Sequence, residues 1–205
     1  MQGDGNTLII GCGGGRDVLT GLLFNATHID AVDVNPLVFD SMNNEIAEFC
    51  GSLYRHEKVD WYAEEGRAFA RRNPGKYDLV QVAMIDTWAA TTAGAYSLSE
   101  NTLYTVQAYR DYIHALKPGG MFSFTRFFFK PPRQTLRLVS VFLEAAKEEG
   151  IENPEDCILV GMYGSLGTVL LKNEPFTQDE IQHFQNDLDD LGFKLVYSPD
   201  SRPDP

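Results

Sequence analysis

The sequence predicts an α/β protein with a mostly parallel, doubly wound sheet of the Rossmann-like kind. Short apolar runs of strand length alternate with segments whose apolar residues recur at helical spacing, as in parallel sheets covered by helices. The first apolar run breaks into four glycines within five residues, and an amphipathic segment follows. This order of strand, tight loop and helix is typical of nucleotide-binding α/β folds.

The glycine-rich loop follows a strand expected at 8–10 and precedes a helix expected at 17–24. Glycine adopts left-handed backbone angles without strain, and without a Cβ it leaves the peptide N–H groups open to a ligand. We expect the loop glycines to contact a ligand; they are Gly11, Gly13, Gly14 and Gly15.

The next expected strand, at 29–33, ends in Asp33. Its carboxylate is placed to accept hydrogen bonds from ribose hydroxyls, while the helix after the glycine loop points its positive N-terminus at the ligand. Arg16 stands where a dinucleotide-binding loop has its third glycine, which disfavours NAD without excluding it. The pattern therefore predicts a nucleoside-binding site.

The same alternation continues along the chain. Expected elements are a helix at 36–54, a strand at 59–62, a brief helix around 68–69, a strand at 76–82, a helix at 103–116, a strand at 121–128 and a helix at 133–149. Strands at 157–162 and 168–172 follow, and the loop between them is too short for a crossover helix, so they are antiparallel. A capping box at Thr177 and Glu180 opens a helix to residue 191, and 193–197 is either an edge strand or a loop.

The segment 84–101 breaks this alternation with small and hydroxyl residues, one Trp and one Tyr. Long loops without secondary structure are uncommon in compact domains and often act as lids or binding loops. This loop follows the carboxyl end of a central strand, where open α/β sheets bind ligands. We expect a lid at 88–101, rather than a merely solvated insertion.

Composition limits the partners. The 205 residues fit one domain, and 29 acidic against 17 basic side chains give a net charge of −12, which disfavours nucleic acid and favours a small cationic acceptor. Three cysteines at 12, 50 and 157 have no metal-site spacing and form no disulfide framework, so we expect no metal and a cytoplasmic location. No apolar run is long enough to span a bilayer, so we expect no membrane insertion by this chain.

The motifs GCGGG at 11–15 and Asp33 resemble the first two motifs of class I S-adenosylmethionine-dependent methyltransferases. The segments at 76–82, 103–109 and 116–120, with the region of Asp86, resemble the spermidine synthase family of aminopropyltransferases. The stretches IGCGGGRDVL, EEGRAF and DTWAATTAGAYSLSENTLYTVQAYRDY are most similar to the spermidine synthase-like domain at the end of bacterial multi-spanning membrane proteins. The likeness covers about residues 7–197.

This resemblance implies the class I methyltransferase fold, with a seven-stranded, mostly parallel sheet and an antiparallel terminal pair. It implies S-adenosylmethionine or its decarboxylated form as co-substrate, and a polyamine-like acceptor. Glu65 and Gly66 match a family Asp-Gly near the adenine, and Asp86 matches a carboxylate that binds the substrate amine. It also implies that residues 1–205 are a single domain within a longer protein, leaving open membrane-spanning segments elsewhere and a homodimer.

The departures from the family pattern bear on catalysis. Ala83 stands where the family has the acid that deprotonates the attacking amine, and Gly14 stands where an acid is usual in the glycine loop. Asp86, or Glu100 from the expected lid, is a candidate to take over the catalytic role. Three hypotheses follow: an aminopropyltransferase-like enzyme, a small-molecule methyltransferase, and a non-catalytic nucleoside-binding module that regulates a membrane protein.

Overall fold

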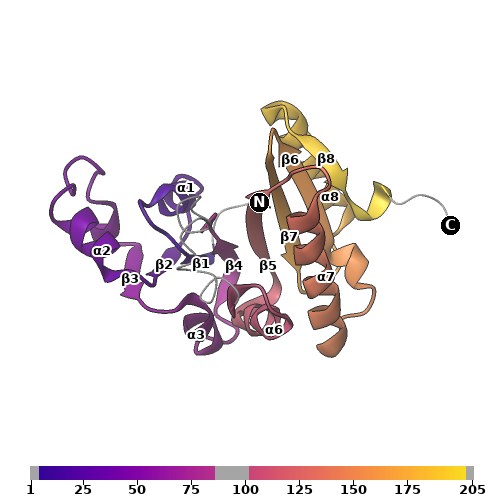
Figure 1. The fold of residues 1–205 in the computed structure, drawn as a ribbon, viewed down its shortest axis with the longest axis horizontal. Helices are drawn as coiled ribbons and strands as arrows, with labels where there is room; N and C mark the ends of the chain where they lie inside the picture. The colour runs from indigo at the N-terminus through magenta and orange to yellow at the C-terminus, as the bar shows by residue number, and fades with distance from the viewer. Residues whose placement is uncertain (1–4, 86–101, 202–205) are drawn as a thin grey trace.

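The computed structural model describes residues 5–85 and 102–201. Their strands form one sheet in the order β3-β2-β1-β4-β5-β7-β6-β8 (Figure 1). The strands are β1 (Asn6–Ile10), β2 (His28–Asp33), β3 (Val59–Ala63), β4 (Tyr77–Val82), β5 (Leu116–Phe127), β6 (Ile158–Tyr163), β7 (Leu166–Lys172) and β8 (Lys194–Tyr197).

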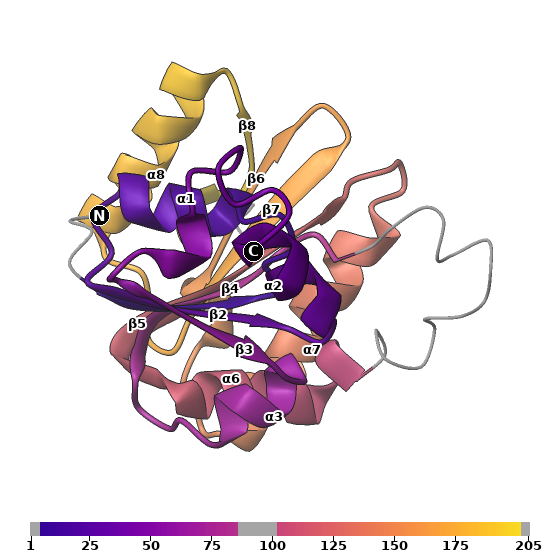
Figure 2. The ribbon, with the colours of Figure 1, turned by 90° about the vertical axis from the view of Figure 1, so that its left-hand side faces the viewer.

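Helices cover both faces of the sheet (Figure 2). The α-helices are α1 (Arg16–Leu23), α2 (Pro36–Asn43), α3 (Gly66–Arg71), α6 (Val106–Ala115), α7 (Arg133–Glu148) and α8 (Gln178–Leu191), and the 3-10 turns are η1 (Leu53–Arg55), η2 (Pro154–Cys157) and η3 (Pro199–Ser201). In Figure 2, α1, α2 and α8 lie on one side of the sheet, and α3, α6 and α7 lie on the other. The chain is therefore a three-layered α/β structure, as the sequence predicts.

Three hydrophobic core clusters lie between the sheet and the helices on its two faces. The largest core cluster joins β1, β4 and β5 to α3, α6 and α7. Its largest buried side chains are aromatic, among them Tyr109 and Phe124, whose stacked rings have centroids 5.1 Å apart. A second cluster packs α1 and α2 against β1 and β2, with Val18 and Phe39 fully buried or nearly so. A third, smaller cluster packs Ile181 of α8 against β5 and β6.

The parallel half of the sheet comprises β3, β2, β1, β4 and β5, which all pair in parallel. Beyond it, β7 pairs antiparallel with β5, and β6 and β7 form a hairpin turned at residues 164–165. The predicted parallel strands and the antiparallel pair are confirmed. Because parallel strands end at the same edge, the loops after β1, β2 and β4 meet there.

The sheet of the described residues has eight strands, so the expected count of seven was wrong. The additional strand is β8, which pairs antiparallel with β6. It is only four residues long, its register shifts between Val160 and Gly161 on β6, and its residues are half-buried or exposed. A short, half-exposed edge strand has a weak apolar pattern, so the sequence pattern alone did not decide between a strand and a loop at 193–197.

The helix expected at 36–54 was also wrong in length, because α2 ends at Asn43. Turns occupy 44–52, and η1 follows. Ile46 and Phe49 continue the helical spacing, yet Phe49 is 93% exposed, so no buried face stabilises a longer helix. Ser52 adopts a positive φ of 52°, which ends helical geometry before Tyr54.

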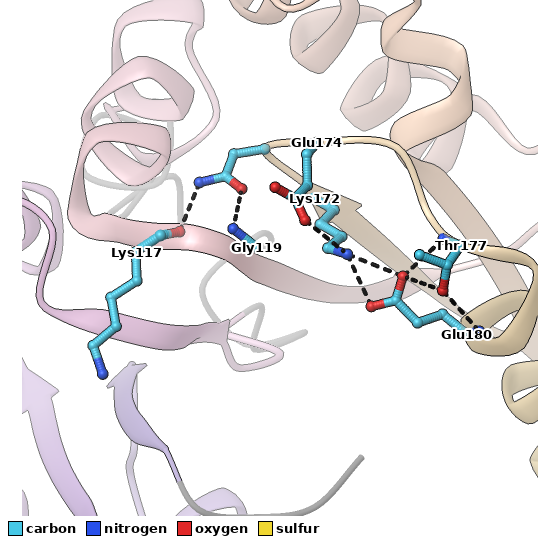
Figure 3. Close-up of polar contacts among 7 residues, drawn as sticks. Lys117, Gly119, Lys172, Glu174, Thr177 and Glu180 are labelled. Carbon is cyan, nitrogen blue, oxygen red and sulfur yellow. Dashed lines mark hydrogen bonds and ion pairs between the residues drawn. The ribbon is translucent and has the colours of Figure 1, made fainter.

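Strand β5 begins at Leu116, earlier than the expected residue 121. Asn173 holds this first part of the strand, because its amide accepts a hydrogen bond from Gly119 N–H (3.1 Å) and donates one to the Lys117 carbonyl (2.8 Å) (Figure 3). The neighbouring Lys172 side chain is 4% exposed and its Nζ lies 2.9 Å from Glu180 Oε1. Glu180 also completes the predicted capping box with Thr177, so one carboxylate joins the start of α8 to β7.

A polar contact at the amino end of the sheet joins β2 to β4. Asp30 is fully buried, and its Oδ2 accepts hydrogen bonds from Lys76 Nζ and Tyr77 OH, each at 2.5 Å. Burial alone raises the pKa of this carboxyl, but the hydrogen bonds from Lys76 and Tyr77 outweigh it and hold the pKa below its ordinary value. The carboxylate is therefore ionised and serves as a structural anchor, at the end of the strands opposite to Asp33.

Two further findings concern membrane-spanning helices and the cysteines. None of the helices in the described ranges is long and apolar enough to cross a membrane. Cys12, Cys50 and Cys157 are all free thiols.

Candidate nucleoside-binding site

The candidate site lies at the carboxyl edge of the parallel strands. Ile10 of β1 pairs with Val32 on one side and with Val82 on the other, so these three strands end level with one another. Gly11 N–H donates to the Val32 carbonyl (2.8 Å), and Ala83 N–H donates to the Ile10 carbonyl (3.0 Å). The structure therefore brings the glycine loop beside the segment that begins at Asp33 and beside the end of β4.

Asp33 and the glycine loop are joined directly. The Asp33 Oδ2 atom accepts a hydrogen bond from Gly13 N–H (3.1 Å), and Oδ1 accepts one from Asn35 N–H (3.0 Å). A carboxylate offers about four acceptor positions, so these bonds fix its orientation and leave others for a ligand. Asp33 is half-buried at the strand end.

The loop conformation explains its glycines. Gly11, Gly13 and Gly15 have positive φ angles of 75°, 46° and 83°, which side chains rarely tolerate. A Cβ at Gly15 would also lie 2.3 Å from Leu53 Cδ2. Gly14 differs, because its φ lies outside this range and a Cβ there would meet nothing within 4 Å.

Tyr54 supports the glycine loop, and no sequence pattern indicates this contact. Its hydroxyl donates a hydrogen bond to the Gly13 carbonyl (2.7 Å), and its ring is 2% exposed. The ring packs edge-on against Phe39 of α2, with centroids 5.2 Å apart. The 41 residues that separate Tyr54 from Gly13 carry no local pattern for this contact, so only the folded structure shows it.

Replacing Tyr54 by phenylalanine is expected to destabilise the glycine loop. The change leaves the Gly13 carbonyl without its donor while keeping the ring, and losing such a bond costs about 1–2 kcal/mol. We expect a lower free energy of unfolding in urea and weaker binding of a nucleoside ligand. Replacing the partly exposed Tyr197 by phenylalanine, which removes a hydrogen bond to the Glu155 carbonyl far along the sheet, is the control. Equal binding losses in the two variants would contradict a specific role for Tyr54.

Cys12 lies inside the glycine loop but is not a nucleophile. Its side chain is 5% exposed, and burial raises the pKa of the thiol to about 12, against a smaller lowering by Tyr54. A neutral thiol at this depth is unreactive. Cys12 therefore belongs to the core beneath the loop, with Val18 and Leu53.

Glu65 and Gly66 begin α3 at the same edge of the sheet. The Glu65 carboxylate caps that helix, because Oε1 accepts from Arg67 N–H (3.1 Å) and Oε2 from Ala68 N–H (2.7 Å). Gly66 is buried against β1, where a Cβ would lie 2.3 Å from Ile10 Cγ2. Both residues therefore help to place α3, and this structural role is separate from any contact with a ligand.

Gly66 offers a test of this close packing. Gly66→Ala is expected to lower the free energy of unfolding by about 1–3 kcal/mol, because the new methyl group overlaps Ile10. Gly14→Ala is the matched control, since its methyl group meets no atom. The double variant Gly66→Ala with Ile10→Ala, which removes the overlapping Cγ2, should show a smaller loss than the sum of the single variants, measured by urea unfolding. An additive result would mean that the two residues do not interact.

The structure does not describe the predicted catalytic residues. Asp86, Glu100 and the expected lid at 88–101 lie outside the described residues. The described end of β4 is apolar: Ala83 is 6% exposed, and the side chain of Ile85 covers Gly11. Within the described residues, the structure therefore joins Asp33, Gly13 and the start of α3, but it does not place a catalytic acid or base.

Comparison with known protein families shows which family this chain belongs to. The family model of the spermine/spermidine synthase domain matches residues 2–170. The chain belongs to this family. The resemblance predicted from the sequence is therefore confirmed, while the association with a membrane protein remains a prediction. A search of curated proteins gave no match.

Solved structures show the same fold in both spermidine synthases and methyltransferases. Spermidine synthase from Thermotoga maritima matches with a TM-score of 0.59 and 16% identity, over 85% of this chain and 56% of its own. Human methyltransferase-like protein 13, in complex with SAH, matches with a TM-score of 0.60 and 14% identity, over 91% of this chain and 81% of its own. The N-methyltransferase NodS from Bradyrhizobium japonicum matches with a TM-score of 0.51 and 17% identity, over 82% and 85%.

These likenesses establish the class I methyltransferase-like fold of this spermidine synthase-like chain. The chain spans little more than half the length of the Thermotoga maritima enzyme. At such low identity, the activities of the neighbours do not transfer with the fold, because one fold supports many reactions. The function has to be argued from the site itself.

Proposed function

We propose that this spermidine synthase-like domain binds an adenosyl sulfonium co-substrate, S-adenosylmethionine or its decarboxylated form, and transfers a carbon group from it to a small cationic acceptor. The observation that carries the proposal is the hydrogen bond between Asp33 and Gly13 N–H. This hydrogen bond fixes the Asp33 carboxylate, the proposed ligand of the ribose, against the glycine loop at the N-terminus of α1. This is the arrangement that nucleoside recognition requires in an open α/β sheet.

The acceptor side of the proposal has separate support. The net charge of −12 attracts cations, and a polyamine carries several ammonium groups at neutral pH. The fold neighbours include a spermidine synthase, whose name indicates a polyamine product. We therefore propose a polyamine-like acceptor, bound in the cytoplasm, with Asp86 or Glu100 as the groups that orient its amine.

A second candidate function is nucleoside binding without catalysis, and Ala83 favours it. A methyl group, 6% exposed, occupies the end of β4 beside the glycine loop, where a base for the acceptor amine would be well placed. A module that binds the nucleoside and passes the signal to another protein needs Asp33 and the glycine loop, but no base. A small-molecule methyltransferase is the third possibility, because the fold serves both classes of enzyme.

Calorimetric titration separates these functions. The ligands are S-adenosylmethionine, its decarboxylated form, methylthioadenosine and NAD. Binding of any of the first three in preference to NAD supports the proposal, and binding of NAD alone contradicts it. Mass spectrometry of mixtures with putrescine or spermidine then shows whether a methyl or an aminopropyl group is transferred. A bound nucleoside with no product from either donor supports the binding module.

A further inference from the structure

Three side chains of the kinds that bind metals meet toward the amino ends of β2 and β3. His28 and Asp30 lie two residues apart on β2, so their side chains point to the same face of the sheet. Asp60 of β3 is the register partner of Asp30 and therefore shares that face. One ring nitrogen and two carboxylate oxygens, one atom from each residue, all lie within 4.8 Å of one another. Because Asp33 ends the same strand that His28 begins, this cluster is separate from the candidate nucleoside site.

The distances in this cluster are those expected between ligands of one metal ion. His28 Nε2 lies 3.2 Å from Asp30 Oδ1 and 3.4 Å from Asp60 Oδ2. Two ligands bound at about 2.0–2.1 Å to a tetrahedral zinc ion are about 3.3–3.4 Å apart, because the tetrahedral angle separates them. Charge-assisted hydrogen bonds are shorter, at about 2.7–2.9 Å, and a single N–H cannot point well at two oxygens. A shared cation therefore accounts for this convergence better than two hydrogen bonds do.

Asp30 is fully buried and is held in the orientation that a metal ligand needs. Lys76 Nζ and Tyr77 OH both bind its Oδ2, each at 2.5 Å, while its Oδ1 faces His28. Carboxylates that bind metals are themselves fixed by hydrogen bonds of this kind. Lys76 balances the charge of one of the two carboxylates, so the cluster with a neutral His28 keeps a negative charge that favours a cation.

A metal ion can reach this cluster from solvent. The His28 side chain is 30% exposed, and that of Asp60 is 63% exposed. Asp60 also lines a pocket of about 500 Å³ at the surface, together with His56, Glu57 and Tyr62. This pocket offers an entry path and room for the water that completes the coordination, because three protein ligands leave one tetrahedral position open.

We propose that His28, Asp30 and Asp60 bind a divalent transition-metal ion, zinc, with water in the remaining position. Imidazole together with carboxylates suits zinc, whereas magnesium and calcium prefer sites made of oxygen ligands. β3 lies at one end of the strand order and pairs, among the described strands, with β2 alone, so the ion fastens this edge strand to its neighbour. The proposal does not depend on the proposed function, and it revises the expectation of no metal, which rested on the cysteines.

Calorimetric titration of zinc into the untagged chain, first freed of metal with a chelator and then dialysed, tests the proposal. We expect one ion per chain and a rise in the unfolding temperature, whereas magnesium at the same concentration should give neither. His28→Ala and Asp60→Ala should each raise the Kd for zinc at least about tenfold, because each removes a direct ligand. Both side chains are partly exposed, so these variants keep the buried Asp30 anchor and are expected to fold.

His183→Ala is the matched control for His28→Ala, because it removes an exposed histidine on α8. It should keep the wild-type affinity for zinc and the same rise in unfolding temperature. His56→Ala tests whether the neighbouring histidine of the pocket is the ligand instead. Circular dichroism without zinc checks that each variant is folded. The proposal is overturned if the wild-type chain binds no zinc, if His28→Ala binds it as tightly as the wild type, or if only His56→Ala loses it.

Discussion

Asp33→Ala is expected to weaken nucleoside binding by about 1.5–3 kcal/mol, which is roughly a 10-fold to 150-fold rise in Kd. The variant removes the acceptor for two ribose hydroxyls. It also frees Gly13 N–H and Asn35 N–H, which Asp33 holds at 3.1 and 3.0 Å. Two losses therefore add: the direct contact with the ligand, and the fixed shape of the glycine loop.

Calorimetry with methylthioadenosine measures this loss, since that ligand probes the nucleoside part alone. Asp60→Ala is the matched control, because it removes the same charge from an exposed residue near the opposite end of the strands. Asp33→Asn separates the two losses, since its amide oxygen can still accept one hydrogen bond. Unchanged affinity in Asp33→Ala would remove the whole site assignment.

The parallel half of the fold could be predicted because its signals are local. Strand β1 ends in a continuous apolar run, and every side chain from Leu8 to Ile10 is at most 3% exposed. A strand buried on both faces has no polar alternation, so the run itself marks it. The glycine loop and Asp33 were predictable for the same reason, because backbone angles and strand ends dictate these residue types.

The parts that could not be predicted depend on contacts that are distant in the sequence. Helical spacing continues through Ile46 and Phe49, yet these side chains are exposed, and spacing without burial did not extend α2. Tyr54 reaches Gly13 across 41 residues, and no periodicity encodes that hydrogen bond. Glu65 is likewise a helix cap by its geometry, although its sequence context also fits a ligand contact.

Ala83→Asp is expected to have the largest effect on chemistry. An amine must be neutral to attack a sulfonium, and a primary amine with a pKa near 10 is well under 1% neutral at pH 7. A carboxylate positioned as a general base contributes about 10²–10⁴ in rate. The main chain of Ala83 is fixed by its hydrogen bond to the Ile10 carbonyl, so a carboxylate at this position would lie beside the glycine loop.

The rate of transfer to putrescine or spermidine, followed by mass spectrometry from pH 6 to 10 with the donor that binds best, checks this expectation. In the wild-type protein the rate should rise with pH, because the neutral amine comes from the solution equilibrium. In Ala83→Asp the rate near pH 7 should increase, and the dependence on pH should become flatter. Ala83→Asn has nearly the same shape but cannot accept a proton, so it should behave as the wild type does. Equal rates in the Asp and Asn variants would show that position 83 supplies no base. No transfer by any of the three proteins, with donor binding confirmed, would contradict the aminopropyltransferase hypothesis and leave the small-molecule methyltransferase and the binding module.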